Sequence, residues 1–240
     1  ADCERTVNAM HACLLKVPWS GSGKGLNWCL HGFTKPVSNW CERVLREQGC
    51  LTAEPIYNKV KDFALEFYSD GQGEVRFAGY SVFSTNEHGA YTGNLLASDG
   101  QIEESIACCL PLEKLTGIRE ALRAELASIY GNTYTGYLGV DMMVCRSDKE
   151  NGYRVHPCVE INMRMNMGVV ARLFYDRFVA PGSKGCFAVE YVPDNETLRA
   201  RHEQDMHDYP LMVEQGRLAS GYLPLVPVTG KSCYRAYVRI

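Results

Sequence analysis

The spacing of apolar residues in the first fifty positions predicts two short strands and a helix. Residues 13–17 are apolar except for Lys16, and apolar character returns at residues 26–30 after a loop rich in serine and glycine. A helix is expected to begin near Ser38 and to end at Gly49, because glycine is the commonest residue just past the last helical turn. The N-terminal part therefore alternates strand, loop, strand and helix.

The middle of the chain has the pattern of a β-hairpin. Residues 50–57 form one candidate strand, and residues 62–68 alternate with period two before a turn signal at 69–73. Residues 75–84 are expected to pair back onto 62–68. The stretch 85–100 is polar and contains several glycines, so we expect a loop or lid there.

A long helix and a second hairpin follow. Leucine and isoleucine recur at spacings of three and four over residues 112–129, which is the pattern of an amphipathic helix. Residues 136–145 and 152–162 are two apolar runs that can form a hairpin centred near residue 150. Directly paired positions in a hairpin sum to a constant, so this centre predicts that Asp141 faces Glu160, give or take one residue.

The remaining sequence is less patterned. A helix is expected over residues 171–178, followed by a less regular tail. We find no internal repeat and no low-complexity segment. Helices and antiparallel hairpins in this order indicate an α+β fold.

Composition and charge narrow the functional classes. The chain has 240 residues, is 46% hydrophobic and 22% charged, and can bury a sizeable core without a disulfide or structural metal. Its formal net charge is -3, and its basic residues are scattered along the sequence. They form no basic stripe that could bind the phosphate backbone of a nucleic acid, so nucleic acid is not an expected partner. The sequence contains no run of 18 apolar residues, so no membrane span is expected. Its N-terminus lacks a basic segment followed by an apolar one, so an intact signal peptide is not expected either.

The cysteines indicate a reducing compartment. There are 11 of them, an odd number without a Cys-x-x-Cys pair, which favours neither a disulfide framework nor a zinc ribbon. A cytoplasmic location is therefore expected. The adjacent Cys108 and Cys109 are too close for an ordinary disulfide, and their apolar neighbours predict that they fill the core.

A glycine-rich loop is the first candidate site. It consists of Ser20, Gly21, Ser22, Gly23, Lys24 and Gly25. Its backbone amides can converge on an anion, and Lys16 and Lys24 supply positive charge, so a phosphate fits. The loop is not a Walker A motif, because Pro18 and Gly25 stand where that motif has glycine and serine or threonine. A flexible hairpin connection without a ligand is the alternative.

Two carboxylates in apolar strands are the second candidate. Asp141 and Glu160 would be costly to bury without compensation. Glu160 and Asn162 are two residues apart and share a strand face, and this set of oxygen ligands suits Mg²⁺. A salt bridge from either carboxylate to Arg154 or Arg164 is the alternative.

A proline-marked strand end is the third candidate. Glu54 and Ile56 flank Pro55, and Asp62 follows a few positions later. The exposed backbone edge could pair with an adenine ring, and Asp62 could bind ribose hydroxyls. An ordinary strand end with a solvated aspartate is the alternative.

The order of these features over about residues 14–170 resembles the ATP-grasp family, the fold of D-alanine:D-alanine ligase, biotin carboxylase and the purine-pathway carboxylate ligases. The most specific part is a Gly-Val-Asp strand ending at Asp141, followed by the Glu-x-Asn-x-Arg segment 160–164. The resemblance implies two lobes of antiparallel sheet with helices and a nucleotide site between them. The lobes would cover residues 1–55 and 56–180, and residues 181–240 would form a C-terminal extension packed on the core.

The resemblance also assigns roles in nucleotide binding. Lys16 would contact the ATP phosphates, and the loop 20–25 would close over the β- and γ-phosphates. Glu54 and the backbone at Ile56 would flank adenine, and Asp62 would hold the ribose.

Further roles concern the metal and the reaction. Asp141, Glu160 and Asn162 would bind Mg²⁺, and Arg164 would lie near the transferring phosphate, where its planar fork suits bidentate binding. Lys16 and Arg164 would thus be the catalytic residues. Members of the family normally carry an α/β domain upstream of the lysine strand, so the resemblance implies such a domain in the full-length protein or an unusually short member.

The function that the resemblance implies is an ATP- and Mg²⁺-dependent ligase. It would activate a small-molecule carboxylate as an acyl-phosphate, which an amine then attacks. A kinase acting on a small metabolite is an alternative, since the same fold can pass phosphate to a hydroxyl. A non-catalytic ATP-binding module is another.

Overall fold

A computed structural model describes residues 2–21, 24–87, 89–147 and 152–240 of the chain. Its contacts divide into two compact units, one comprising Ala1–Asn58 and Thr85–Tyr91 and the other Lys59–Ser84 and Thr92–Ile240. We call them the smaller and the larger unit. Each has a hydrophobic core of its own.

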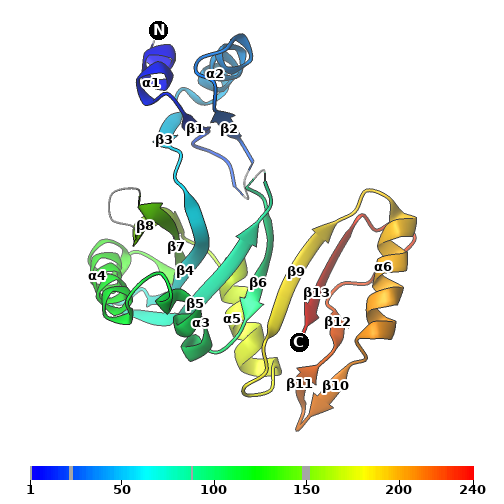
Figure 1. Cartoon of the computed structure of the whole chain (residues 1–240). Helices are drawn as coiled ribbons and strands as arrows, with labels where there is room; N and C mark the ends of the chain where they lie inside the picture. Colours follow the sequence, from blue (N-terminus) through cyan, green and yellow to red (C-terminus); the bar gives the residue numbers. More distant parts are fainter. Residues whose placement is uncertain (1, 22–23, 88, 148–151) are drawn as a thin grey trace. The chain divides into compact units, whose positions relative to one another are not determined.

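The smaller unit is a three-stranded antiparallel sheet with two helices (Figure 1). The strands lie in the order β2-β1-β3. The elements are α1 (Asp2–Met10), β1 (Cys13–Lys16), β2 (Leu26–Cys29), α2 (Lys35–Gln48) and β3 (Thr52–Pro55). The two predicted strands and the helix are confirmed, and α1 is an addition that the sequence did not predict.

Helix α2 shows how the sequence sets its limits. It begins at Lys35, earlier than the expected start at Ser38, because Pro36 fits the first turn, where its missing N–H leaves no bond unmade. It ends at Gly49, as predicted, which adopts the left-handed conformation with φ 79° and donates its N–H to the Leu45 carbonyl oxygen at 3.0 Å. Val37 and Cys41 face the core of the unit.

The larger unit is built on an eight-stranded sheet in the order β12-β13-β9-β6-β5-β4-β7-β8 (Figure 1). Its last strands in sequence are β9 (Gly185–Tyr191), β12 (Tyr222–Pro224) and β13 (Tyr234–Arg239). Its strands up to β8 are β4 (Lys59–Asp70), β5 (Val75–Thr85), β6 (Tyr91–Leu96), β7 (Thr135–Ser147) and β8 (Gly152–Asn162). Its helices are α3 (Asp99–Ala107), α4 (Leu112–Tyr130), α5 (Met167–Phe178) and α6 (Asn195–Asp208). Both predicted hairpins and the long helix α4 are confirmed, as is the α+β class.

The two faces of strands β4 and β7 differ in character. Side chains alternate between faces along a strand, so Phe63 and Leu65 of β4 share one face with Val140 and Met142 of β7. All four belong to the main hydrophobic core, to which α3 and α4 also contribute. The opposite face carries the acidic side chains described below.

The expected loop or lid at residues 85–100 is wrong for residues 91–100. Strand β6 occupies much of this stretch, and α3 begins at Asp99 after an N-cap at Ser98. Strand β6 pairs with β9, whose Phe187 carbonyl oxygen would lie only 2.4 Å from a Cβ at Gly93. The glycine that suggested a loop therefore permits close strand pairing.

The tail is also more regular than expected. It contains β9 (Gly185–Tyr191), β10 (Met212–Glu214), β11 (Arg217–Ser220), β12 (Tyr222–Pro224) and β13 (Tyr234–Arg239), besides α6. Strands β9, β12 and β13 extend the eight-stranded sheet, and α6 lies beside β12 and β13 (Figure 1). Arg235 is 5% exposed and joins these elements through Glu190 and Asp205, with both contacts at 2.6 Å.

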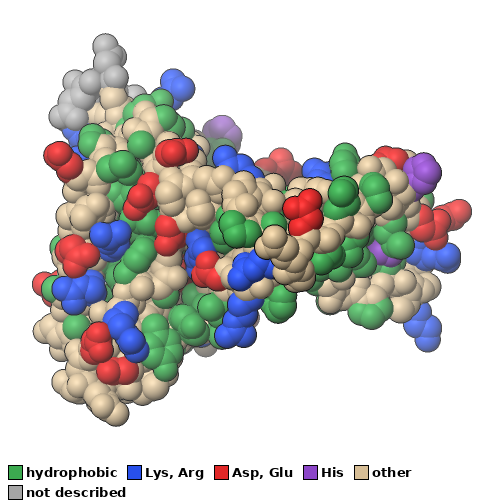
Figure 2. Space-filling view, turned by 90° about the horizontal axis from the view of Figure 1, so that it is seen from below, with side chains coloured by type: hydrophobic (Ala, Val, Ile, Leu, Met, Phe, Trp, Pro, Cys, Tyr) green, Lys and Arg blue, Asp and Glu red, His purple; other side chains and the backbone are tan. Residues whose placement is uncertain are grey.

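The surface agrees with the charge distribution of the sequence. On the face shown in Figure 2, acidic and basic side chains are intermixed with hydrophobic ones. Among the described residues, no helix combines the length and the apolar character that a membrane crossing requires.

The expectation that Cys108 fills the core is wrong, because its side chain is exposed at the end of α3. Cys109 is half-buried against the main core.

Candidate nucleotide and metal site

Lys16 and Glu54 form an ion pair in the smaller unit. Lys16 ends β1 and Glu54 lies on β3, the strand that pairs with β1. The Lys16 Nζ atom is 2.6 Å from Glu54 Oε2, and both side chains are partly exposed. The sheet thus brings together two residues that the sequence predicted to contact the nucleotide. Ile56 lies just after β3 and is partly buried.

The glycine loop connects β1 and β2. The Val17 N–H donates to the Gly25 carbonyl oxygen at 3.1 Å, and the Lys24 N–H donates to the Gly21 carbonyl oxygen at 3.2 Å. Gly25 has φ 72°, and a Cβ there would lie 2.2 Å from a methyl group of Val17. Glycine is therefore required at this position. Ser20 is described and exposed, whereas Ser22 and Gly23 lie outside the described residues.

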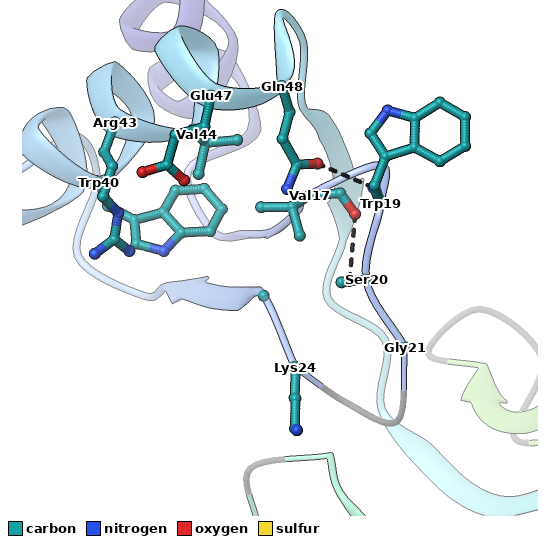
Figure 3. A pocket seen from close by; sticks show the side chains of 11 residues that line it. Val17, Trp19, Ser20, Gly21, Lys24, Trp40, Arg43, Val44, Glu47 and Gln48 are labelled. Carbon is teal, nitrogen blue, oxygen red and sulfur yellow. Dashed lines mark hydrogen bonds between the residues drawn. The ribbon is translucent and has the colours of Figure 1, made fainter.

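A pocket of about 420 Å³ lies between this loop and helix α2 (Figure 3). The Trp19 N–H donates to Gln48 Oε1 at 3.0 Å, which ties the loop to the helix. Trp40, Arg43 and Glu47 of α2 line the pocket. Lys24 also lines the pocket, and Figure 3 shows its side chain extending away from α2.

Asp141, Glu160 and Asn162 come together on the β7–β8 hairpin. Asp141 pairs directly with Glu160, within the predicted margin of one residue, and a β-bulge between Asp141 and Met143 shifts the register nearer the turn. Asn162 is two residues further along the same face, and its Nδ2 atom donates to Asp141 Oδ2 at 3.0 Å. Glu160 is exposed, whereas Asp141 is partly buried. The arrangement places two carboxylates and one amide side by side.

The electrostatics of this group favour a cation. Burial and, next, the charge of Glu160 raise the pKa of Asp141 to about 7, while the Asn162 amide acts in the opposite direction. Asp62 of β4 adds to the increase and so lies within electrostatic reach, and it forms an ion pair with Lys59 at 2.5 Å. Like charges held together in this way repel each other unless a cation or a proton is bound.

The donor set matches the preferences of one metal. Mg²⁺ binds oxygen ligands and usually takes only one or two carboxylates, because it keeps waters and substrate phosphates in its shell. Asp141 and Glu160 supply two carboxylates. The Asn162 amide turns its Nδ2 to Asp141 and its Oδ1 to Arg164 in this structure, so its carbonyl oxygen reaches an ion beside Asp141 only after the amide group turns over. Within the described parts of the chain, no cluster of three or more His, Cys, Asp or Glu side chains forms a metal cage of its own. Two carboxylates are the number of protein ligands that Mg²⁺ usually takes, so these residues fit that ion.

Two hydrogen-bonded anchors hold the segment that carries Arg164. At one end, Asn162 bonds Asp141 and its Oδ1 atom accepts from Arg164 NH2 at 3.0 Å. At the other end, Asn166 caps helix α5 by accepting from the Val169 N–H at 2.9 Å. Asn166 Nδ2 donates to Glu66 Oε2 at 2.8 Å. Arg164 itself is exposed between these anchors.

Glu66 is a residue of this site that sequence reasoning missed. It lies on β4 in the same row as Gly139 and Asn162, is 1% exposed, and burial raises its pKa to about 8. Ser81 and Asn94 are buried in the same region and bond each other at 2.6 Å. The sequence held a signal for Glu66, because this residue interrupts the apolar run 63–67 and lies on the same face of the strand as Asp62. Period-two alternation alone favours an exposed face for such a residue.

Two glycines make room for the Glu66–Asn166 pair. A Cβ at Gly139 would lie 2.2 Å from Asn166 Nδ2 and 2.4 Å from Glu66 Oε2. A Cβ at Gly168, in the first turn of α5, would lie 2.1 Å from Glu66 Oε1 and 2.6 Å from Ser81 Oγ. The carboxyl group of Glu66 therefore fits here because β7 and α5 each have a glycine, which carries no side chain, beside it.

Replacing Gly168 by Ala is expected to lower the free energy of unfolding by about 1–3 kcal/mol, because the added methyl group overpacks a filled site. Gly117→Ala is the matched control. Gly117 lies within helix α4 and a Cβ there meets nothing within 4 Å, so this change should stabilise the chain by about 0.5–1 kcal/mol. Urea unfolding of both variants measures the difference, and equal stabilisation by the two changes would contradict the packing described.

Solved structures share this fold. The chain superimposes on the biotin carboxylase domain of Hydrogenobacter thermophilus 2-oxoglutarate carboxylase, solved with MgADP, ADP and bicarbonate, with TM-score 0.59 and 12% identity over 100% of the chain. N5-carboxyaminoimidazole synthetase from Staphylococcus aureus with ADP matches with TM-score 0.56 and 12% identity over 98% of the chain. Carboxyaminoimidazole ribonucleotide synthase from Aspergillus clavatus with ATP matches with the same three values.

The chain spans 55% of the first of these proteins, 59% of the second and 60% of the third. No protein-family model matches the sequence, and no curated protein matches it either. At this level of identity the likeness shows the fold.

Proposed function

The chain has the ATP-grasp fold, and from this premise we propose that it binds ATP with Mg²⁺ and uses them to join a carboxylate to an amine. The observation that carries the proposal is the pairing of Asp141 with Glu160 beside Asn162. Three oxygen-bearing side chains on one sheet face, two of them acidic, form a group that a divalent cation bound to phosphate would stabilise.

The proposed roles are those of the matching residues in the family that the sequence resembles. Asp141, Glu160 and Asn162 would hold Mg²⁺, which when bound neutralises phosphate charge. Lys16 and the loop containing Ser20, Gly21, Lys24 and Gly25 would contact the phosphates through an ammonium group and backbone amides. Glu54 and Ile56 would flank adenine, and Asp62 would bind the ribose.

The proposed reaction has two steps. The carboxylate of the acceptor attacks the γ-phosphorus of ATP, ADP leaves, and an acyl-phosphate forms. An amine then attacks the acyl carbon, and phosphate leaves as the amide bond forms. Arg164 would bind the transferring phosphoryl group through its planar guanidinium, and positioning with charge neutralisation supplies most of the rate in such transfers.

Product analysis tests the proposal. The chain is incubated with Mg²⁺, ATP and mixtures of small carboxylic acids and amines, and the products are separated by mass spectrometry. We expect ADP and free phosphate in equal amounts with an amide product. Phosphate retained on the acceptor would indicate a kinase, and tight Mg²⁺-dependent ATP binding without ADP formation under any acceptor mixture would indicate a binding module.

Lys16→Met is expected to weaken ATP binding about 10- to 100-fold, because a charge-assisted contact to phosphate contributes about 1.5–3 kcal/mol. Lys35→Met, at the exposed start of α2, is the matched control and should bind ATP as the unmodified chain does. Isothermal titration calorimetry at fixed salt measures both. Equal affinities for the two variants would remove Lys16 from the proposed site.

A further inference from the structure

Cys108 and Cys109 form a pair of neighbouring thiols at the junction of α3 and α4. Their Sγ atoms lie 3.4 Å apart. Cys108 is exposed and Cys109 is half-buried, and both are free thiols. The pair is part of the larger unit and belongs to none of the elements assigned to nucleotide or metal binding.

Neighbouring groups hold the pair in place. The Cys108 Sγ–H donates to the Ser105 carbonyl oxygen at 3.4 Å, and the Lys61 ammonium donates to the same oxygen. The Tyr153 hydroxyl bonds the Cys109 sulfur, and the Lys61 charge acts on it as well. Burial, followed by the neighbouring thiol, raises the pKa of Cys109, so the protonated form is favoured at neutral pH.

The geometry disfavours a disulfide between the two residues. Adjacent Cα atoms are about 3.8 Å apart across a trans peptide bond, whereas disulfides usually need about 4.4–6.8 Å. It also disfavours a linear two-coordinate metal, because the two sulfurs would have to lie on opposite sides of the ion. A centre that bonds two sulfurs at nearly a right angle needs them close together, as they are here.

We propose that Cys108 and Cys109 form a chelating dithiol site for a trivalent arsenic centre of the type R–As=O. The reaction is a condensation without oxidation or reduction. Two As–S bonds form, the As=O bond breaks, and the two thiol protons leave with the oxygen as one molecule of water. Thiolate-type sulfur is the soft ligand that such a centre prefers.

The experiment uses the full chain, reduced with a phosphine and treated with phenylarsine oxide. We expect one phenylarsenic group per chain by mass spectrometry, retained in excess monothiol and removed by 2,3-dimercaptopropanol. Chelation by two sulfurs raises the effective affinity about 100-fold or more over a single sulfur. Cys108→Ser and Cys109→Ser should each lose the monothiol-resistant adduct, and Cys233→Ser, which removes another exposed thiol, should keep it.

Peptide mapping of the unmodified chain gives a test that needs no variant. The arsenical should protect Cys108 and Cys109 together from alkylation by iodoacetamide. An unmodified chain without a monothiol-resistant adduct, an adduct that survives in both Cys108→Ser and Cys109→Ser, or protection at other cysteines alone would each overturn the proposal. These readouts are independent of ATP, so they remain valid if the proposed ligase activity fails.

Discussion

Asp141→Asn is expected to reduce Mg²⁺-dependent ATP binding by about 100-fold or more and to abolish ADP formation. Replacing even an outer-shell partner of a metal ligand typically costs 10- to 100-fold, and a direct ligand should cost at least as much. Calorimetric titration of ATP in the presence of Mg²⁺ measures the change. Glu125→Gln, which removes an exposed carboxylate from α4, is the control and should bind ATP normally.

The same substitution should stabilise the chain in the absence of nucleotide. Burial and Glu160 raise the pKa of Asp141 to about 7, so the folded chain ionises this carboxyl group at a cost above that pH. Asparagine removes the charge and can still accept from Asn162, and the gain should be on the order of 1–3 kcal/mol at pH 8. A variant that is less stable and still binds Mg²⁺ with ATP would contradict both the electrostatics and the metal assignment.

Glu66→Gln is expected to flatten the dependence of stability on pH. The pKa of Glu66 is raised by burial from 4.5 to about 8, so the folded state retains a proton that the unfolded state releases. The contribution is fully present below pH 4.5 and is lost as the pH rises toward 8. Each unit of pKa difference corresponds to about 1.4 kcal/mol, so the stability of the unmodified chain relative to the variant should fall by about 3–4 kcal/mol between pH 5 and pH 8.

Urea unfolding at several pH values measures this effect. Glutamine keeps the size of the side chain and an oxygen that can accept from Asn166, so the variant should fold. Glu74→Gln removes an exposed carboxylate just before β5 and should leave the slope unchanged. Parallel pH profiles for the unmodified chain and Glu66→Gln would show that Glu66 is ionised in the folded state.

Local signals in the sequence predicted much of the candidate site. The apolar runs on either side of residues 146–151 located the hairpin to within about a residue, but the register set next to the turn changes at a β-bulge between Asp141 and Met143, and this bulge places Asp141 opposite Glu160. The glycines between β1 and β2 predicted a loop, and Gly25 has the positive φ that only glycine adopts freely. Gly49 ended α2 for the same reason.

Features that depend on distant partners could not be predicted. Strand β6 lies between β5, which precedes it in sequence, and β9, which lies far along the chain, and its own residues carry loop-like composition. Glu66 is buried only because Gly139, Gly168 and Asn166 surround it, and these residues come from β7 and the start of α5. Cys108 is exposed because α3 ends at Ala107, a boundary that the apolar composition of the segment did not reveal.

We propose that Asp141, Glu160 and Asn162 bind the metal that accompanies ATP. Crystals of the chain grown with Mn²⁺ and a non-hydrolysable ATP analogue test it most directly, since the anomalous signal of manganese locates the ion independently of the polypeptide. We expect an anomalous peak coordinated by the Asp141 and Glu160 carboxylates and by phosphate oxygens of the analogue. A bound analogue whose manganese ion lies away from both carboxylates would contradict it.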